Sequence, residues 1–455
     1  MIFLPHIILL LQLLRVIAYD LCYGWDFKDG KYLLYTCFSI LLIFVYVVVL
    51  CCLHIMPYRD KNQVSLRLKI MKGATRIFRL CFWGILVQPF LYFFRLYGYA
   101  LVLFSGSGIY TVLFDAVIAF FFYYFLILNG CIRILCTCRS LGVWKRVVCV
   151  FFLWMPLVNL ILARYLSKRA KIEYDAEVYR FENRRIRADS EVCATKYPII
   201  LLHGIGFRDL QYFNYWGRIP TELARNGAIL YYGHQQAWGT IEDNALIIKD
   251  TIKKVLLENQ CDKVNIIAHS KGGLDARYLI SGLHMENQVA SLTTISTPHR
   301  GSELLNILNK LPDPVYRLVA SFFDSSYRIL GDSTPDCYHA SKQLSSEFCE
   351  TFNETYKDSP RVYYQSYASY VKHTLGDNLL SIPNLLMFLA GAPKNDGLVS
   401  IESAQWGHFK KTFVSTGRRG ISHGDMIDLK REDYKGFDVI EAYIQIVSEL
   451  KNSGY

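Results

Sequence analysis

The stretch KVNIIAHSKGG, residues 263–273, decides the fold that this sequence predicts. An apolar, β-branched run ends at Ala268, and small residues stand two positions before and two positions after Ser270. A sharp turn from a strand into a helix presses those two positions together, so only very small side chains fit there. The turn leaves the serine at a helix N-terminus, where backbone N–H groups stabilise developing negative charge. The stretch therefore predicts a nucleophilic serine on a strand-to-helix elbow, with alanine in place of the usual first glycine.

The sequence around this elbow alternates between short β-branched runs and helical stretches. Helices are expected over residues 241–257 and 272–282, and buried strands over residues 197–202, 228–232, 263–268 and 292–296. Strands that alternate with helices indicate a mostly parallel sheet with helices on both faces. Residues 195–455 are long enough for one such domain, and with the elbow they predict an α/β-hydrolase fold.

A second glycine-containing turn follows the first predicted strand, in the sequence LHGIG at residues 202–206. Hydrolases with a nucleophile elbow place one half of the oxyanion hole at this point, because glycine lets the backbone approach the substrate carbonyl. We expect the donors to be the backbone N–H groups of Ile205 and Lys271. The alternative is a turn that only ends the strand.

A serine nucleophile needs a histidine base and a carboxylate that orients the base. The order expected for this fold is serine, acid, histidine, which limits the eleven histidines to those after Ser270. His423 lies in the glycine-flanked loop GISHGD, just before a closing helix that begins near Phe437, and Asp396 lies in KNDGLVS, in a turn before an expected strand. Either residue alone would be an ordinary loop position, but their order favours a Ser270–Asp396–His423 triad.

Two parts of the chain, residues 197–306 and 395–429, resemble the bacterial true-lipase family of triacylglycerol lipases. The matching stretches are YPIILLHGIGF, YWGRIPTELARNGA, KVNIIAHSKGG, STPHRGS, NDGLVS and SHGDMIDL. The resemblance covers most of the predicted hydrolase domain and none of the sequence before it. It implies the same triad and oxyanion donors, and a lipid ester as substrate.

The resemblance also implies a structural calcium ion near the catalytic histidine, although no cofactor is required for the chemistry itself. By position its ligands would be Asp425, two residues after His423, and Asp377, which is placed by spacing alone. Ordinary solvated carboxylates are the alternative. The chain departs from the family in two ways: Ala268 replaces a glycine, and no cysteine follows Cys349 to form the family's disulfide near the acid.

An apolar-periodic segment, residues 302–351, interrupts the matching stretches and predicts amphipathic helices. In a lipase it would form a lid whose apolar face meets the lipid surface. A packed cap helix that does not move is the alternative, and exposure of Phe322 and Phe323 would favour the lid.

The N-terminal 166 residues contain apolar runs near the ~20 residues that a bilayer core requires. Candidate spans are residues 2–18, 32–55, 80–104, 110–128 and 147–166. The fifth run contains Pro156 and Asn159 and ends in basic residues, so a re-entrant or interfacial segment fits it equally well. We expect a multi-pass region over residues 1–166, a basic juxtamembrane linker or strand pair over 167–194, and the hydrolase domain over 195–455.

The formal net charge of +11 comes largely from basic loops beside these runs, which is typical of membrane proteins rather than nucleic-acid binders. The basic loops 57–79 and 129–146 are expected in the cytoplasm. If the fifth run crosses, the hydrolase domain is extracellular; if it does not, the domain is cytoplasmic. The basic flank and the unpaired cysteines favour the cytoplasmic side of a cell membrane.

Together these patterns predict a membrane-anchored serine lipase or esterase that forms an acyl-enzyme. An acyltransferase or deacylase that acts on phospholipid or glycolipid is the nearest alternative. A non-catalytic membrane sensor or scaffold with a hydrolase fold is an alternative from another class. The sequence does not specify acyl-chain preference or oligomeric state.

Overall fold

The computed structural model describes residues 41, 44, 48, 57–58, 64–100, 108–187, 190–207 and 215–455. It contains two compact units, which we call the helical unit, residues 1–181, and the hydrolase unit, residues 182–455. Most of the predicted spans 2–18 and 32–55 lie outside the described residues.

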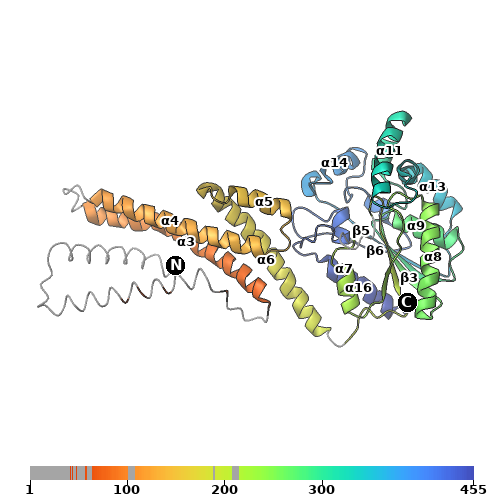
Figure 1. The fold of residues 1–455 in the computed structure, drawn as a ribbon, viewed down its shortest axis with the longest axis horizontal. Helices are drawn as coiled ribbons and strands as arrows, with labels where there is room; N and C mark the ends of the chain where they lie inside the picture. Colours follow the sequence, from red (N-terminus) through yellow and green to blue (C-terminus); the bar gives the residue numbers. More distant parts are fainter. Residues whose placement is uncertain are drawn as a thin grey trace, which may run out of the picture. The chain divides into compact units, whose positions relative to one another are not determined.

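A six-stranded, entirely parallel sheet forms the centre of the hydrolase unit, as Figure 1 shows. Its strand order is β2-β1-β3-β4-β5-β6. The strands are β1 (Ile199–Leu202), β2 (Leu230–Tyr232), β3 (Val264–His269), β4 (Val289–Ile295), β5 (Tyr363–Ser369) and β6 (His408–Phe413). This sheet confirms the α/β-hydrolase prediction for the C-terminal part of the chain.

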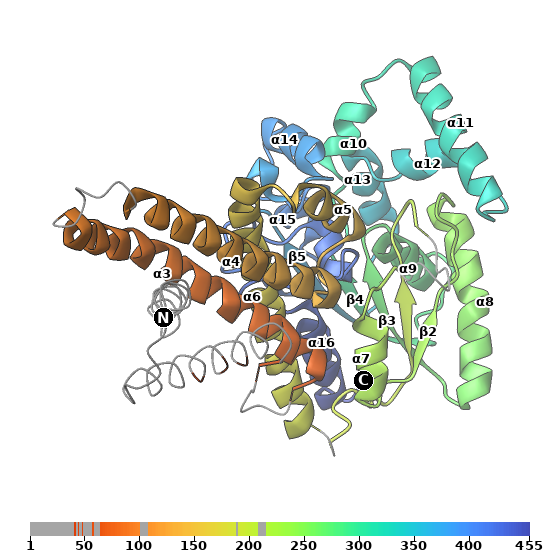
Figure 2. The same cartoon turned by 60° about the vertical axis from the view of Figure 1, so that its left-hand side comes forward.

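Alternate residues of each strand point to opposite faces, so both faces of the sheet are apolar. Ile199 and Leu201 pack in a cluster with α7 (Ile219–Arg225) and α16 (Val439–Asn452). Ile200 and Leu202 pack with α8 (Ile241–Asn259) and α9 (Gly272–Ser281) on the other face. Figures 1 and 2 show these two helical layers. The sheet is thereby held rigid, with the carboxyl ends of its strands at one edge.

The remaining elements of the hydrolase unit are short and lie mainly after β4. They are α10 (Glu303–Leu308), α11 (Asp313–Ile329), α12 (Cys337–Lys342), α13 (Ser346–Thr355), η1 (Thr374–Gly376), α14 (Ser381–Leu389), α15 (Ile401–Ala404) and η2 (His423–Ile427). The strand expected after Asp396 is absent from this described part of the chain. Ser400 instead caps α15 by accepting a hydrogen bond from the Ser403 N–H, which begins a helix there.

Two long helices, α3 (Leu66–Ala100) and α4 (Gly108–Thr137), lie side by side in the helical unit (Figures 1 and 2). Glycine allows their close approach. A Cβ at Gly84 would lie 2.5 Å from the Tyr123 hydroxyl oxygen, and one at Gly130 would lie 2.5 Å from the Phe78 ring. Both glycines therefore mark positions where a side chain of one helix fills the space beside the other.

The fifth apolar run is not one continuous helix. It is divided between α5 (Val143–Phe152) and α6 (Pro156–Ile186), because Pro156 lacks a backbone N–H and is suited to begin a helix. The expected linker or strand pair is also mostly helical, since α6 continues to Ile186. Leu166, Ala170 and Tyr174 form a buried stripe along α6, and their burial stabilises the helix. The high density of charged residues in this segment had indicated a linker instead.

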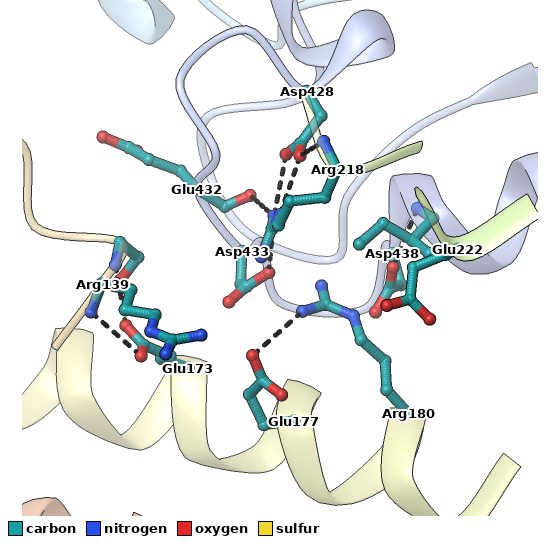
Figure 3. Close-up of polar contacts among 12 residues, drawn as sticks. Arg139, Glu173, Glu177, Arg180, Arg218, Glu222, Asp428, Glu432, Asp433 and Asp438 are labelled. Carbon is teal, nitrogen blue, oxygen red and sulfur yellow. Dashed lines mark hydrogen bonds and ion pairs between the residues drawn. The ribbon is translucent and has the colours of Figure 1, made fainter. Parts of the chain in front are cut away.

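Glu173 on α6 ties the end of α4 to this helix. Its carboxylate accepts hydrogen bonds from the backbone N–H groups of Arg139 (3.1 Å) and Ser140 (2.8 Å) and also pairs with Arg67. Burial alone would raise the pKa of Glu173, but these donors lower it to about 2. Figure 3 shows Glu173 with Arg139. The buried carboxylate therefore satisfies backbone donors in the turn after α4.

No helix in the described part of the chain is long and apolar enough to cross a membrane.

Candidate active site

Ser270 lies at the carboxyl end of β3, in the turn that leads into α9. Its φ of +55° places it in the left-handed region, which is uncommon for a residue other than glycine. The turn is tight, because a Cβ at Gly272 would lie 2.5 Å from the His203 carbonyl oxygen. The small residue two positions after the serine is thus required by backbone packing, as the sequence pattern predicted.

The turn after β1 lies beside this serine. A Cβ at Gly204 would lie 2.7 Å from the Cβ of Ser270, so glycine is required for the approach. The backbone N–H groups of Ile205 and Lys271 donate no hydrogen bond to any described residue. Unpaired backbone donors next to a serine are suited to bind an oxyanion. The Lys271 side chain does not compete for this position, since its ammonium is buried against Asp275 at 2.6 Å.

His423 and Asp396, which the sequence placed in separate loops, form a buried pair. His423 Nδ1 lies 2.8 Å from Asp396 Oδ2, and the two side chains are 8% and 1% exposed. The other carboxylate oxygen accepts backbone N–H bonds from Leu398 (3.0 Å) and Val399 (2.9 Å). These bonds fix the carboxylate, which in turn fixes the orientation of the imidazole.

His269 connects the imidazole of His423 to the nucleophile turn. The centroids of the two histidine rings lie 4.4 Å apart, and His269 directly precedes Ser270. The structure therefore brings the three predicted residues to one edge of the sheet. In the described residues no hydrogen bond joins Ser270 Oγ to His423.

Sequence reasoning missed the part that Tyr215 and His269 play beneath the serine. The Tyr215 hydroxyl lies 2.6 Å from His269 Nδ1 and accepts a hydrogen bond from the Gly204 N–H at 3.0 Å. Burial lowers the pKa of His269 well below its ordinary value, and the neighbouring His423 lowers it further. A neutral ring there adds no charge beside His423. The YWGR stretch was the signal, because it holds two aromatic residues inside a matching segment.

The two proposed calcium ligands do lie together, but protein cations already bind them. Arg419 bridges the two carboxylates: its guanidinium donates to Asp377 Oδ2 at 2.7 Å and to Asp425. Lys430 Nζ lies 2.6 Å from Asp377 Oδ1, and the Tyr434 hydroxyl donates to Asp425 Oδ1 at 2.5 Å. The described residues contain no group of three or more histidine, cysteine or acidic residues that would hold a metal ion. This arrangement does not fit calcium, because the carboxylates are neutralised by side chains.

A second cation fixes the chain directly after this network. Arg218 donates to both carboxylate oxygens of Asp428, at 2.7 and 2.8 Å, and to Asp433 at 3.1 Å (Figure 3). Two parallel bonds of this kind set geometry as well as energy. Asp428 itself has a φ of +56°, so this loop turns sharply five residues after His423.

Helices α10 to α13 occupy the position expected for the lid. On α11 the side chains of Phe322 and Phe323 are 70% and 37% exposed, which favours a lid over a fully packed cap. The Tyr327 hydroxyl donates to the Gly206 carbonyl oxygen at 2.5 Å. The segment is thus bonded to the same glycine turn that holds the free N–H of Ile205.

The parallel sheet, the elbow serine and the buried Asp396–His423 pair define an ester hydrolase of the α/β class. The sequence is 30% identical to triacylglycerol lipase 2 of Saccharomyces cerevisiae over 270 residues, which are 55% of this chain and 77% of that protein. It is 32% identical to a triacylglycerol lipase of Pseudarthrobacter phenanthrenivorans over 177 residues, 36% of this chain and 54% of that enzyme. The chain belongs, through its C-terminal part, to the triacylglycerol lipase family.

Among solved structures, the mature lipase BlEst2 of Bacillus licheniformis matches with a TM-score of 0.42 and 19% identity, covering 56% of this chain and 92% of that one. No model of a known protein family matches the sequence.

Proposed function

We propose that this protein is a membrane-associated serine lipase that hydrolyses carboxylic ester bonds of lipids through an acyl-enzyme. The observation that carries the proposal is the buried contact of 2.8 Å between His423 Nδ1 and Asp396 Oδ2, beside the turn that holds Ser270. The proposal is supported by the chain order of nucleophile, acid and base, and by the hydrogen bond between the acid and the base.

In the first half of the reaction, His423 Nε2 takes the proton of the Ser270 hydroxyl while Oγ attacks the ester carbonyl carbon. The negative charge moves to the carbonyl oxygen, where the N–H groups of Ile205 and Lys271 stabilise it. Asp396 stabilises the imidazolium that forms without taking its proton. The C–O bond then breaks, the alcohol leaves with the proton from His423, and the acyl group stays on Ser270.

In the second half, His423 takes a proton from a water molecule whose oxygen attacks the acyl carbon. The bond to Ser270 Oγ breaks and the serine regains its proton from His423. The products are a carboxylic acid and the free enzyme. The N–H groups of Ile205 and Lys271 stabilise the negative carbonyl oxygen in both halves of the reaction.

A lipid substrate is supported by the relatives, which are triacylglycerol lipases, and by apolar side chains around the site. Phe322 on α11 and Phe388 on α14 are exposed, together with other large apolar residues of these helices: Leu318, Val319, Ile382 and Leu389. Exposed apolar faces of this kind are typical of proteins that bind a lipid surface. Opening of α11 would present this face to aggregated substrate.

Membrane association is supported by the apolar runs of the first 166 residues and by the surface of the helical unit. Large apolar side chains are exposed on α3 and α4, including Phe82, Trp83, Phe120, Phe121 and Phe125. Basic residues follow these runs, which favours attachment with the hydrolase unit in the cytoplasm. The chain would then act on esters supplied by its own membrane.

A fluorophosphonate probe tests the catalytic proposal and the membrane side together. Cells that produce the full chain are labelled intact with an impermeant probe, and again after lysis. We expect labelling after lysis alone, and none of the Ser270→Ala variant in either case. Labelling of intact cells would place the hydrolase unit outside. A wild-type protein that is folded but stays unlabelled after lysis would contradict catalysis.

The products identify the reaction. Incubation with triacylglycerol, phospholipid and glycolipid together should release free fatty acid, because water is the acceptor of the acyl group. Transfer of the acyl group to a lipid alcohol without fatty acid would show an acyltransferase instead.

A further inference from the structure

A cavity of about 910 Å³ opens between helices of the helical unit. Its walls come mainly from α3 and α6, with Ile127 of α4. Lys72 on α3 donates to the Tyr174 hydroxyl on α6 at 2.7 Å, which fixes the register of these two walls. We call this cavity the α3–α6 groove.

The groove is cationic at one end and apolar at the other. Along α3 the lining residues pass from Lys72, Thr75 and Arg79 to Phe82, Ile85 and Leu86. Along α6, read in the opposite direction, they pass from Lys171, Lys168 and Arg164 to Ile161 and Leu160. Because Lys72 meets Tyr174, the cationic ends of the two helices coincide, and so do the apolar ends. The groove therefore has the polarity of an amphiphile.

The cationic end has few internal acids to balance it. Among the described residues that line the groove, five are lysine or arginine and one, Asp175, is acidic, which leaves an excess of four positive charges. Arg79, Arg164, Lys168 and Lys171 are exposed and form no ion pair with any described residue. Four such groups around one end of a cavity favour an anion with several oxygen atoms, since lysine and arginine both bind phosphate.

The length of the groove matches one leaflet of a bilayer. Lys72 and Leu86 are fourteen residues apart on one helix, which is about 21 Å at 1.5 Å per residue. Half of a hydrocarbon core is about 15 Å, to which a head-group region is added. The groove between Lys72 and Leu86 is thus long enough to hold the head group and one acyl chain of a single lipid molecule.

We propose that the α3–α6 groove binds one anionic phospholipid. The phosphate lies among Arg79, Arg164, Lys168 and Lys171, and an acyl chain lies against Phe82, Leu86 and Ile161. A fatty acid fits less well, because its single carboxylate cannot occupy four cations. The site lies wholly within the helical unit and does not depend on the reaction at Ser270.

Thermal unfolding of the full chain in nonionic detergent micelles tests this site. Dioleoyl phosphatidylglycerol should raise the unfolding midpoint by about 5 °C at saturation, whereas dioleoyl phosphatidylcholine, with the same chains and no net charge, should not. The Arg164→Gln/Lys168→Gln variant should lose this shift. Both residues are exposed, so the variant should fold normally.

The Arg185→Gln/Lys254→Gln variant is the matched control, because it removes the same charges from exposed positions outside the groove. It should keep the full shift. An equal loss in both variants would reduce the effect to general surface charge and overturn the site. Equal shifts with the two phospholipids, or a larger shift with oleate, would also overturn the assignment to an anionic phospholipid.

Discussion

Two buried aspartates near the same loop bind two different kinds of basic side chain. Asp396 holds the imidazole of His423, whereas Asp425, two residues further along that loop, holds the guanidinium of Arg419. Both carboxylates are 1% exposed. Histidine can gain and lose its proton near neutral pH, but arginine stays charged. The comparison teaches that one loop combines a proton carrier with a permanent charge that holds the loop in place.

The largest effect is expected at the proton-carrying pair. Asp396→Asn should lower kcat for ester hydrolysis by about 10,000-fold, because the imidazole loses its orientation and the stabilisation of its charged form. The unfolding midpoint should change little, since an amide oxygen can still accept the Leu398 and Val399 N–H bonds. Steady-state kinetics and thermal unfolding of the same preparation measure both. A variant that retains more than a tenth of the activity would remove Asp396 from the mechanism.

A smaller effect on catalysis and a larger one on stability are expected at the permanent charge. Arg419→Ala leaves the buried Asp425 without its cation, which costs about 3 kcal/mol of unfolding free energy. Misplacement of the His423 loop should lower kcat by about 100-fold. The matched control is Arg418→Ala, because Arg418 is the exposed neighbour in the chain. Equal losses in the two variants would mean that the bridge does not hold the loop.

Acid should weaken this charged network before it affects the hydrophobic core. Burial alone would raise the pKa of Asp377, but contacts with Lys430, Ser422 and Arg419 have a larger effect and lower it from 3.8 to about 2. A carboxylate whose folded pKa is depressed stabilises the fold above its unfolded pKa, and that stability disappears as the pH falls through the folded value. The advantage of wild type over Asp377→Asn in unfolding midpoint should therefore shrink between pH 4 and pH 2. An Asp250→Asn control, at an exposed position, should show no such trend.

The smallest effect is expected from removal of calcium. Arg419 and Lys430 already neutralise the carboxylates that would bind the ion, so a chelator should change kcat by less than about twofold and the unfolding midpoint by less than about 1 °C. Activity and unfolding are measured with excess EGTA and again with added calcium. A midpoint that rises with calcium in the wild type would show that the ion binds and that the protein cations do not replace it.

Strands β1 to β4 could be predicted from the sequence, because each contains a run of apolar or β-branched residues. The expected strand 263–268 and the observed β3 differ by one residue at each end. Strand β5 and the edge strand β6 were missed. β6 reads HFKKTF, and its side chains are mostly exposed, so no apolar run distinguishes it from a loop. The helical continuation of α6 was missed because charged residues alternate with the residues of its buried stripe, so the apolar pattern is not clear in the sequence.

The arrangement around the candidate site was only partly predictable. Ser270, Asp396 and His423 were proposed from motifs and chain order, and their joint role stays a prediction although two of them form a hydrogen bond. The aspartates 377 and 425 were proposed as ligands of one calcium ion, and in the structure both carboxylates contact Arg419. Nothing in the local sequence indicated that Arg419 would lie between them, because an exposed loop arginine and a partly buried bridging arginine look alike in sequence.

Local sequence is enough to specify the elbow at Ser270, because the constraint acts between residues close in the chain and only small side chains satisfy it. The tertiary structure alone decided which cation each buried carboxylate meets. Asp377 is separated from Arg419 by 42 positions and from Lys430 by 53. Pairing over such distances depends on how whole loops fold onto the sheet, and a charge is placed by that folding rather than by its neighbours in the chain.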